Sequence, residues 1–393
     1  MNKKIVLIQL IPVLFAFFVM GFVDVVGIST SYVKEDFDLS DTLSNLLPMM
    51  VFIWFAVCSL PTGLIMNRIG RKNMVLISIA ITLLAMLLPV FEYSYVIVLM
   101  SFVLLGIGNT ILQVSLNPLL IDVVSEDKVA SMLTLGQFIK AISSMLGPVI
   151  ATLAVSLFGN WHLIFWVYAF VSLLSGLWLI FTSINEKNII SENSSFAQVL
   201  SLLKEREMIM SFSVILLIVG FEIGLMTAVP KYFAERCSLP ISEGSLGCSV
   251  YFAARMLGTF LGTFILAKYS PRKFLMWNII VAIVALAVFL MLSHMMTMMV
   301  LLFVIGLTCA NVFPIIFSEA IKSRPDKANE VSSLMIMGVA GGAVLPFIMG
   351  VVADTYNQCV SILVPLFALI YILFVSFVLK KKVISVPLKL GRV

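Results

Sequence analysis

The sequence predicts an all-α membrane protein whose twelve transmembrane helices form two pseudo-symmetric halves of six. Two observations lead to this fold class. Hydrophobic residues make up 61% of the chain and charged residues only 11%, far from the balance of a soluble domain. The apolar residues also form continuous runs of about 20, a length that crosses ~30 Å of hydrocarbon as a helix. Continuous runs exclude a β-barrel, whose strands alternate apolar and polar side chains.

Twelve apolar runs follow one another along the chain, separated by polar or basic turns. The first run follows Lys3 and Lys4, as in a secretory signal. It is too long for a signal and lacks a small-residue cleavage site, so we expect a retained first helix. In chain order, the predicted spans cover residues 6–32, 43–66, 74–92, 95–120, 130–156, 161–183, 208–232, 244–267, 274–293, 297–321, 330–353 and 358–379.

A polar stretch between the sixth and seventh runs divides the chain. We expect an N-terminal six-helix half at residues 1–183, a cytoplasmic linker at 184–207, and a C-terminal half with a short cytoplasmic tail at 208–393. Apolar residues recur in the linker on one helix face, which predicts an amphipathic helix on the inner membrane surface or on the bundle. These residues are Phe196, Val199, Leu200 and Leu203.

The halves repeat each other around a basic turn. Gly63 to Lys72 follow the second run, and the similar segment Gly262 to Lys273 follows the eighth. Basic turns also predict orientation, because cytoplasmic loops collect Lys and Arg. Of the 25 basic residues, twenty fall on the side of the N-terminus and three on the other. We therefore expect a bacterial-type inner (plasma) membrane protein with both termini cytoplasmic, and the net charge of +5 does not indicate nucleic-acid binding.

Four ionisable residues lie near the middle of apolar runs: Asp24, Lys140, Glu222 and Arg255. A lone charge there costs at least ~2.5–3.5 kcal/mol on insertion scales, so such residues are functional candidates by default. Each half contributes one acid and one base, which can neutralise one another in a central cavity. This pattern favours a transporter with Asp24 and Glu222 as proton-coupling acids. The alternative is a pair of salt bridges that only lock helices together.

The first basic turn reads Gly-x-x-x-Asn-Arg-x-Gly-Arg-Lys from Gly63 to Lys72. It resembles the signature of the major facilitator superfamily, with Asn67 in the place of the usual acid. The resemblance implies the major facilitator fold, with substrate bound near the midplane between two parallel repeats. It also implies a gating or structural role for Arg68, Arg71 and Lys72. An ordinary basic loop is the alternative.

A narrower resemblance is to the fucose permease family. It rests on Asn117-Pro118, Gln137, the run from Phe313 to Ser318, the glycines and proline of the eleventh run, and the run from Val219 to Glu222. The resemblance implies a monomeric carrier that imports a fucose-like or hexose-like monosaccharide together with protons.

Three departures from that family concern charge. Gln113 stands where the family has a protonatable Glu, Asp24 lies about one turn before the family's acid, and Lys140 replaces an uncharged polar residue. One interpretation is a rearranged site. In it, Asp24 pairs with Lys140 when deprotonated and releases Lys140 to the sugar when protonated, and Glu222 with Arg255 acts in the same way.

Neutral side chains complete the predicted sugar site. Amides both donate and accept hydrogen bonds, as ring hydroxyls require, and aromatic rings cover apolar ring faces. The alternatives are interhelical hydrogen bonds for the amides and ordinary packing for the rings. The candidates are the amides Gln113, Asn117, Gln137 and Asn311, with the rings Trp54, Tyr251 and Phe221.

Other chemistry has little support in the sequence. The five cysteines are scattered without a C-x-x-C pair, and both histidines lie at predicted outer helix ends. We expect no metal or cofactor, and no enzyme activity, because no nucleophile with a base and no phosphate loop is present. Three alternatives to a proton-coupled sugar importer stay open: a carrier of an anionic sugar such as a uronate or sialic acid, an uncoupled sugar uniporter, and an exporter of lipophilic drugs. Free cations in the cavity favour the anionic sugar.

Overall fold

The computed structural model describes residues 3–39, 43, 46–186, 195–237 and 246–378. Every element in this part of the chain is a helix. Eleven helices are long and apolar enough to cross a membrane, and a shorter apolar helix, Ile8–Asp24, occupies the place of the first predicted run. The prediction of a multi-pass all-α membrane protein is confirmed. The predicted tail after residue 379 lies outside the described residues.

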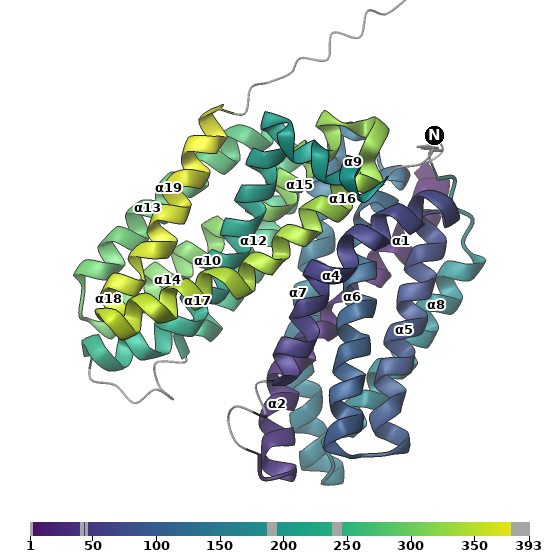
Figure 1. The fold of residues 1–393 in the computed structure, drawn as a ribbon, viewed down its shortest axis with the longest axis horizontal. Helices are drawn as coiled ribbons and strands as arrows, with labels where there is room; N and C mark the ends of the chain where they lie inside the picture. The colour runs from purple at the N-terminus through teal and green to yellow at the C-terminus, as the bar shows by residue number, and fades with distance from the viewer. Residues whose placement is uncertain (1–2, 40–42, 44–45, 187–194, 238–245, 379–393) are drawn as a thin grey trace, which may run out of the picture.

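The first bundle carries the N-terminal part of the chain (Figure 1). Its elements are α1 (Lys3–Met20), η1 (Gly21–Asp24), α2 (Val25–Asp36), α4 (Leu46–Ile69), α5 (Arg71–Phe91), α6 (Tyr95–Val123), η2 (Glu126–Lys128), α7 (Val129–Phe158) and α8 (Leu163–Phe181).

The second bundle follows the linker helices. Its elements are α10 (Arg206–Cys237), α12 (Leu246–Leu266), α13 (Pro271–Met291), α14 (Met295–Cys309), α15 (Val312–Ser323), η4 (Pro325–Lys327), α16 (Ala328–Met337), η5 (Gly338–Ala340), α17 (Gly341–Thr355), α18 (Gln358–Ser361) and α19 (Leu363–Val378).

The linker helix is present as α9 (Phe196–Ser201), continued by η3 (Leu202–Lys204). A capping box begins α9, in which Ser195 and Gln198 satisfy each other's backbone N–H groups. Val199 and Leu202 are buried, and α9 contacts α4 and α16. The linker helix therefore packs on the helix bundles, one of the two predicted options, but through Val199 and Leu202; Phe196 and Leu200 of the predicted apolar face are exposed.

Four pairs of corresponding helices in the two bundles begin with the same spacing. Helices α4 and α12 begin at residues 46 and 246, α5 and α13 at 71 and 271, α6 and α14 at 95 and 295, and α8 and α19 at 163 and 363. Each pair of starts is thus 200 residues apart. Close backbone contacts between helices repeat as well: Gly106 lies against the backbone of Val51, and Gly306 lies against the backbone of Tyr251.

The first predicted span, residues 6–32, is not one continuous helix. It breaks at η1, between α1 and α2, and Asp24 is the last residue of the break. The break coincides with a close crossing, because a Cβ atom on Gly21 would collide with the Lys140 carbonyl and with Ser143 on α7. The eleventh span also breaks, at η5, where Gly341 lies against the Leu216 carbonyl. Short 3₁₀ segments inside helices often mark hinges.

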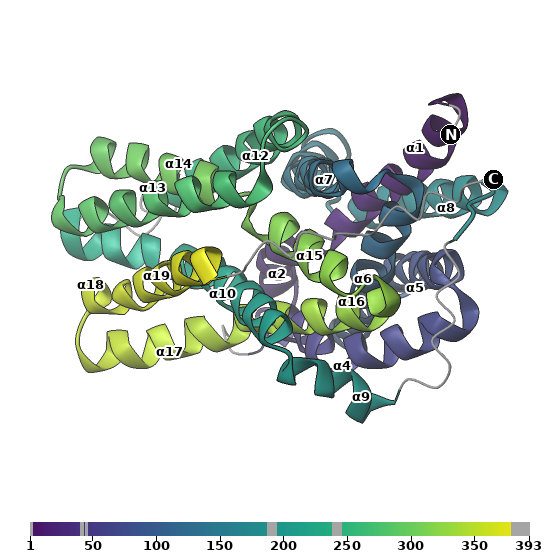
Figure 2. The same ribbon diagram turned by 90° about the horizontal axis from the view of Figure 1, so that it is seen from above.

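The two bundles converge at one end and diverge at the other (Figure 1). We call the end where they meet the basic end, because it carries the turns at residues 68–72 and 322–327. There α16 contacts α4 and α6, and α7 contacts α12 and α15. Seen from above, α16 reaches across to the first bundle (Figure 2). The opposite end, at the turns after Asp36 and Phe91, we call the open end.

Candidate functional site

The four predicted charges come together from both bundles. Lys140 lies in the middle of α7, Glu222 in α10 and Arg255 in α12, while Asp24 lies at the break after α1. The charge of Glu222 interacts with those of Arg255, Lys140 and Asp24, and the charge of Arg255 interacts with that of Asp24. The four residues therefore form one electrostatic cluster between the bundles, which we call the central charges.

Glu222 and Arg255 form an ion pair inside the second bundle. Their side chains are 12% and 34% exposed. Tyr251, one turn before Arg255, and Phe221, next to Glu222, are buried beside them. The contact satisfies one acid and one base of the cluster within the same bundle.

Asp24 and Lys140 are not in contact. The Asp24 carboxylate accepts a hydrogen bond from the Ser144 hydroxyl, which also lies 3.0 Å from the Lys140 carbonyl oxygen. Within the described residues, the Lys140 ammonium forms no hydrogen bond or ion pair. The expected pair of Asp24 with Lys140 is thus replaced by a pair of Asp24 with Ser144. Ser144 lies four residues after Lys140 on the same face of α7, and this spacing is the signal that could have identified it.

Three amides on α6 form a ladder towards α1. Asn117 Nδ2 donates to the Gln113 carbonyl at 2.7 Å, Gln113 Nε2 donates to Asn109 Oδ1 at 2.8 Å, and Asn109 Nδ2 donates to the Met20 carbonyl at 2.7 Å. All three amides are buried. The ladder ends at the residue before η1, so it supports the break that carries Asp24. Asn109 is not among the residues predicted from the sequence, although it continues the spacing of four residues.

Several candidates for direct sugar contact lie in packing positions. Asn311 Nδ2 donates to the Gly258 carbonyl at 2.9 Å, which joins α12 to the start of α15. Tyr251 is 1% exposed. Trp54 is half-buried, and its ring lies against Gly106 of α6. Of the remaining amides, Gln137 is half-buried, three residues before Lys140.

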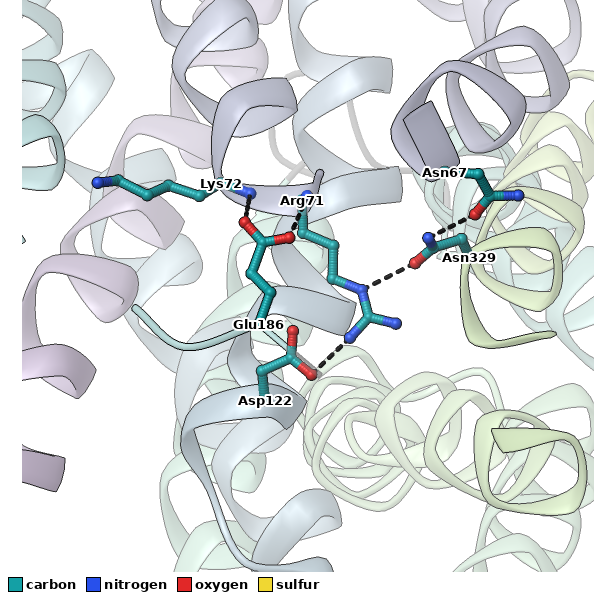
Figure 3. Close-up of polar contacts among 6 residues, drawn as sticks. All are labelled: Asn67, Arg71, Lys72, Asp122, Glu186 and Asn329. Carbon is teal, nitrogen blue, oxygen red and sulfur yellow. Dashed lines mark hydrogen bonds and ion pairs between the residues drawn. The ribbon is translucent and has the colours of Figure 1, made fainter. Parts of the chain in front are cut away.

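Arg71 lies at the centre of a polar network at the basic end (Figure 3). Its guanidinium donates to Asp122 Oδ1 at 2.5 Å and to Asn329 Oδ1 at 2.8 Å. Asn329 Nδ2 in turn donates to Asn67 Oδ1 at 2.6 Å. Arg71 is 4% exposed. Since Asn329 belongs to the second bundle, the network ties the two bundles together.

Glu186 holds the start of α5. Its carboxylate accepts from the backbone N–H groups of Arg71 and Lys72 at 2.7 and 2.9 Å (Figure 3). Gly70, which precedes them with φ of 87°, makes the sharp turn out of α4. The carboxylate thus satisfies two N–H groups that the helix start leaves without partners.

Lys72 binds the end of a neighbouring helix. Its ammonium donates to the carbonyls of Ile180 and Thr182 at the end of α8, at 3.1 and 2.8 Å. Arg272 makes the corresponding contact in the second bundle, with the carbonyls of Ser376 and Phe377. A cation at a helix C-terminus is electrostatically favourable. Arg68 is exposed, and the part of the chain that the structure describes gives its side chain no polar contact.

Further contacts join the bundles at the basic end. Asn67 Nδ2 donates to Glu330 Oε1 at 2.7 Å, which explains why an amide stands where an acid is usual: the acid is on the facing helix. The Ser332 hydroxyl donates to the Val114 carbonyl at 2.7 Å, and the Ser131 hydroxyl donates to the Thr263 carbonyl at 2.6 Å. None of these contacts is predicted from the sequence.

At the open end, Asp36 is the centre of an aromatic cluster. Its Oδ2 accepts from the Tyr93 hydroxyl at 2.6 Å and from Trp161 Nε1 at 2.9 Å, and lies 3.5 Å from His162 Nε2. Burial alone raises the pKa of Asp36. The hydrogen bonds from Tyr93, Trp161 and His162 outweigh burial, so the pKa of Asp36 is lowered overall.

Comparison with known proteins agrees with this architecture. The sequence profile of the Major Facilitator Superfamily matches residues 13–346. The chain belongs to the Major Facilitator Superfamily. As a member of this superfamily it is a multi-pass membrane transporter rather than an enzyme.

Relatives and structures within the Major Facilitator Superfamily are similar over almost the whole chain. A glucose/galactose transporter of Brucella abortus is 24% identical and covers 92% of each chain. The crystal structure of FucP in the outward conformation superposes with a TM-score of 0.84 at 16% identity, covering 95% of this chain and 99% of FucP. A second structure, of the E. coli fucose:proton symporter FucP, gives a TM-score of 0.82 at 16% identity, covering 96% and 99%.

Proposed function

We propose that this protein is a secondary active transporter that imports a monosaccharide, fucose-like or hexose-like, together with protons. The observation that carries the proposal is the cluster of central charges between the two bundles, because an acid with a carboxylate outside any ion pair can exchange a proton. Asp24 is that acid. The Brucella relative is named for glucose and galactose, and FucP for fucose and protons, which supports the same substrate class.

We propose that the structure represents the outward-facing state of an alternating-access cycle. On this proposal the basic end and both termini face the cytoplasm, across a bacterial-type inner membrane. Residues 1–183 and 208–393 are then the moving halves, and residues 184–207 are their linker. Arg71 and Lys72 belong to the gate, which must release Asn329 before the basic end opens. We assign no gating contact to Arg68, and propose a monomer as the transporting unit.

We propose that the sugar binds beside the central charges. Asp24, Gln137 and Lys140 are our first candidates for contact with its hydroxyl groups, because each is at least partly exposed. Gln113 and Asn117 support the break at η1. Glu222 with Arg255 forms the opposite wall of the site, and Glu222 is the second acid able to carry a proton.

A carrier of an anionic sugar is the second candidate, and one observation favours it. Lys140 has no acid in contact among the described residues, so its ammonium is available to a substrate carboxylate. A neutral sugar satisfies Lys140 only through hydroxyl oxygens, whereas a uronate also neutralises its charge. The amides around the site argue against a lipophilic drug.

Uptake into proteoliposomes tests both candidates. The panel contains D-glucose, D-galactose, L-fucose and D-glucuronate, with an imposed pH gradient and with the gradient collapsed. We expect accumulation of a neutral sugar that disappears on collapse and in the Asp24→Asn variant. Equilibration that ignores the gradient indicates a uniporter and ends the coupling proposal, and selective uptake of glucuronate supports the second candidate instead.

A further inference from the structure

We propose that the linker helix binds the surface of the lipid bilayer at the basic end, with Phe196 and Leu200 of α9 inserted among the lipid chains. On the proposed orientation this surface belongs to the cytoplasmic leaflet. The inference concerns how the linker between the two halves is held, and it does not depend on the substrate.

The apolar side chains of α9 and η3 form a wider stripe than the bundles cover. Val199 and Leu202, at one edge of the stripe, are 1% and 2% exposed. Phe196 and Leu200, at the other edge, are 52% and 43% exposed, and Leu203 lies between the edges. At about 3.6 residues per turn, the two edges point roughly 110° apart. The stripe therefore faces two different surroundings, of which the helix bundles are only one.

The linker helix lies at the depth where the membrane begins. Seen from above, α9 lies at the outer margin of the molecule, beside α4 (Figure 2). Only Glu205 separates η3 from α10. Ile209, in the first turn of α10, is 42% exposed, and Ile65, four residues before the end of α4, is 47% exposed. Exposed aliphatic side chains on spanning helices face lipid, so hydrocarbon begins within about 5 Å, one turn, of these helix ends.

The side of α9 opposite the apolar stripe is polar. Gln198 and Ser201 lie on this side and are exposed. Lys204, at the end of η3, is exposed beside the edge that carries Leu200. Long basic side chains at a membrane surface extend to the phosphate groups, which every phospholipid carries. The helix therefore fits the corner between a protein wall and a bilayer, with one apolar edge towards each and its polar side in water.

A second protein fits the exposed edge poorly. Stable protein interfaces bury about 800 Å² on each partner, far more than two side chains supply. A bilayer needs no such area, because the contacts of α9 with α4 and α16 already hold it at the membrane surface.

Lipid contact also accounts for the stability of so short a helix. Helix α9 has six residues and η3 adds three, and isolated helices of this length are not stable in water. The capping box at Ser195 satisfies only N–H groups at the start. Burial of Phe196 and Leu200 in lipid therefore stabilises the helix together with the packing of Val199 and Leu202.

Spin labels on α9 in proteoliposomes test the inference. Leu200→Cys and Ser201→Cys place labels on adjacent residues, one at the exposed apolar edge and one on the polar side, after the five native cysteines are replaced by alanine. The label at position 200 should be relaxed by oxygen, which dissolves in lipid, and shielded from a water-soluble nickel chelate. The label at position 201 should show the reverse.

Two outcomes of this experiment overturn the inference. Relaxation of both labels by the nickel chelate would place the apolar edge in water. Shielding of the label at position 200 from both reagents would mean that another protein surface, such as a second copy of the chain, covers that edge.

Hydrogen exchange in lipid nanodiscs is the second measurement, and it uses the chain with its native cysteines. In the double variant Phe196→Ser with Leu200→Ser, the α9 amides should exchange faster than in wild type by on the order of tenfold, because two lipid-buried side chains are lost. Ala197→Ser, outside the apolar stripe, should change the rates by about twofold or less. Equal rates in the double variant and in Ala197→Ser would rule out the lipid contact, whatever sugar or proton uptake shows.

Discussion

At the residue scale, the amide of Asn67 and the carboxylate of Glu330 on the facing helix form a matched hydrogen-bonded pair. The superfamily signature has an acid at this position, whereas here the acid is Glu330 on α16 and the amide donates to it. Asn329 donates to the same amide from the other side. The amide therefore satisfies a donor and an acceptor at once, which a carboxylate cannot do.

Restoring the usual acid should weaken this protein. In Asn67→Asp, two carboxylates face each other in a buried contact, because Glu330 is 1% exposed. We expect a loss of roughly 1–3 kcal/mol, the cost of leaving buried polar groups unsatisfied. Thermal unfolding in detergent measures it. Adding Glu330→Gln should recover most of the loss, and an unchanged melting temperature in Asn67→Asp would show that the contact contributes little.

The stability that Asp36 gives to the open end depends on pH. Its pKa in the folded protein lies below the ordinary value of 3.8, so its stabilising effect is complete above that value and is lost as the pH falls through the lowered pKa. Asp36→Asn should lower the melting temperature at pH 7, by the equivalent of about 1 kcal/mol. The difference from wild type should shrink as the pH falls below about 4. A difference that is constant down to the lowest pH would contradict this account.

At the scale of helices, the two long spans that break do so beside glycines at close helix crossings. Gly21 and Gly341 each let a backbone carbonyl of another helix approach closely, and each lies at a 3₁₀ segment. Backbone contact of this kind replaces side-chain packing between membrane helices. Both breaks therefore coincide with close crossings between helices.

Gly341→Ala tests the importance of this contact. The added Cβ would collide with the Leu216 carbonyl, so α10 and α17 must separate. We expect destabilisation of roughly 1–3 kcal/mol, typical of overpacking, in a thermal or denaturant unfolding experiment. Gly350→Ala on the same helix is the control, because nothing lies within 4 Å of its added Cβ. Equal effects of the two substitutions would argue against the crossing as the cause.

The helices and their family could be predicted from the sequence because apolar runs and the basic turn are local signals. The close crossing at Gly21 could not, because it involves the Lys140 carbonyl of another helix. The same holds for the partners of Arg71, since Asn329 is 258 residues away. Ser144 was missed because a serine in an apolar helix usually bonds its own backbone. The pairing of Glu222 with Arg255 was foreseen only as one of two options.

For the whole molecule, the contacts at the basic end decide which end is open. Asn329 links Arg71 and Asn67 of the first bundle to α16 of the second. Its two hydrogen bonds across the bundles are lost in Asn329→Ala, and Arg71 keeps only Asp122 among its described side-chain partners. The balance between the two end-states should therefore move away from the conformation described above.

Spin labels on the two bundles measure this shift. Lys128 and Lys268 are exposed at the basic end, one on each bundle, and suit cysteine labelling. Asn329→Ala should move the distance distribution to longer values, with a change in population worth roughly 1–3 kcal/mol. Asn73→Ala, which removes only a local bond to the Ile69 carbonyl, should leave the distribution unchanged. An unaltered distribution in Asn329→Ala would mean that other contacts keep the basic end shut.

Because four pairs of helices are spaced by 200 residues, a residue in one bundle can be compared with the residue at the equivalent position in the other. Arg255 corresponds to Phe55, Gln113 to Phe313 and Asn117 to Phe317. Phe55 and Phe317 are buried in the core, and the rings of Phe313 and Phe317 stack at 5.7 Å. The scaffold thus accepts a plain aromatic ring at each of these places. At these three pairs of positions the two bundles therefore differ in chemistry, a polar side chain in one and an aromatic ring in the other.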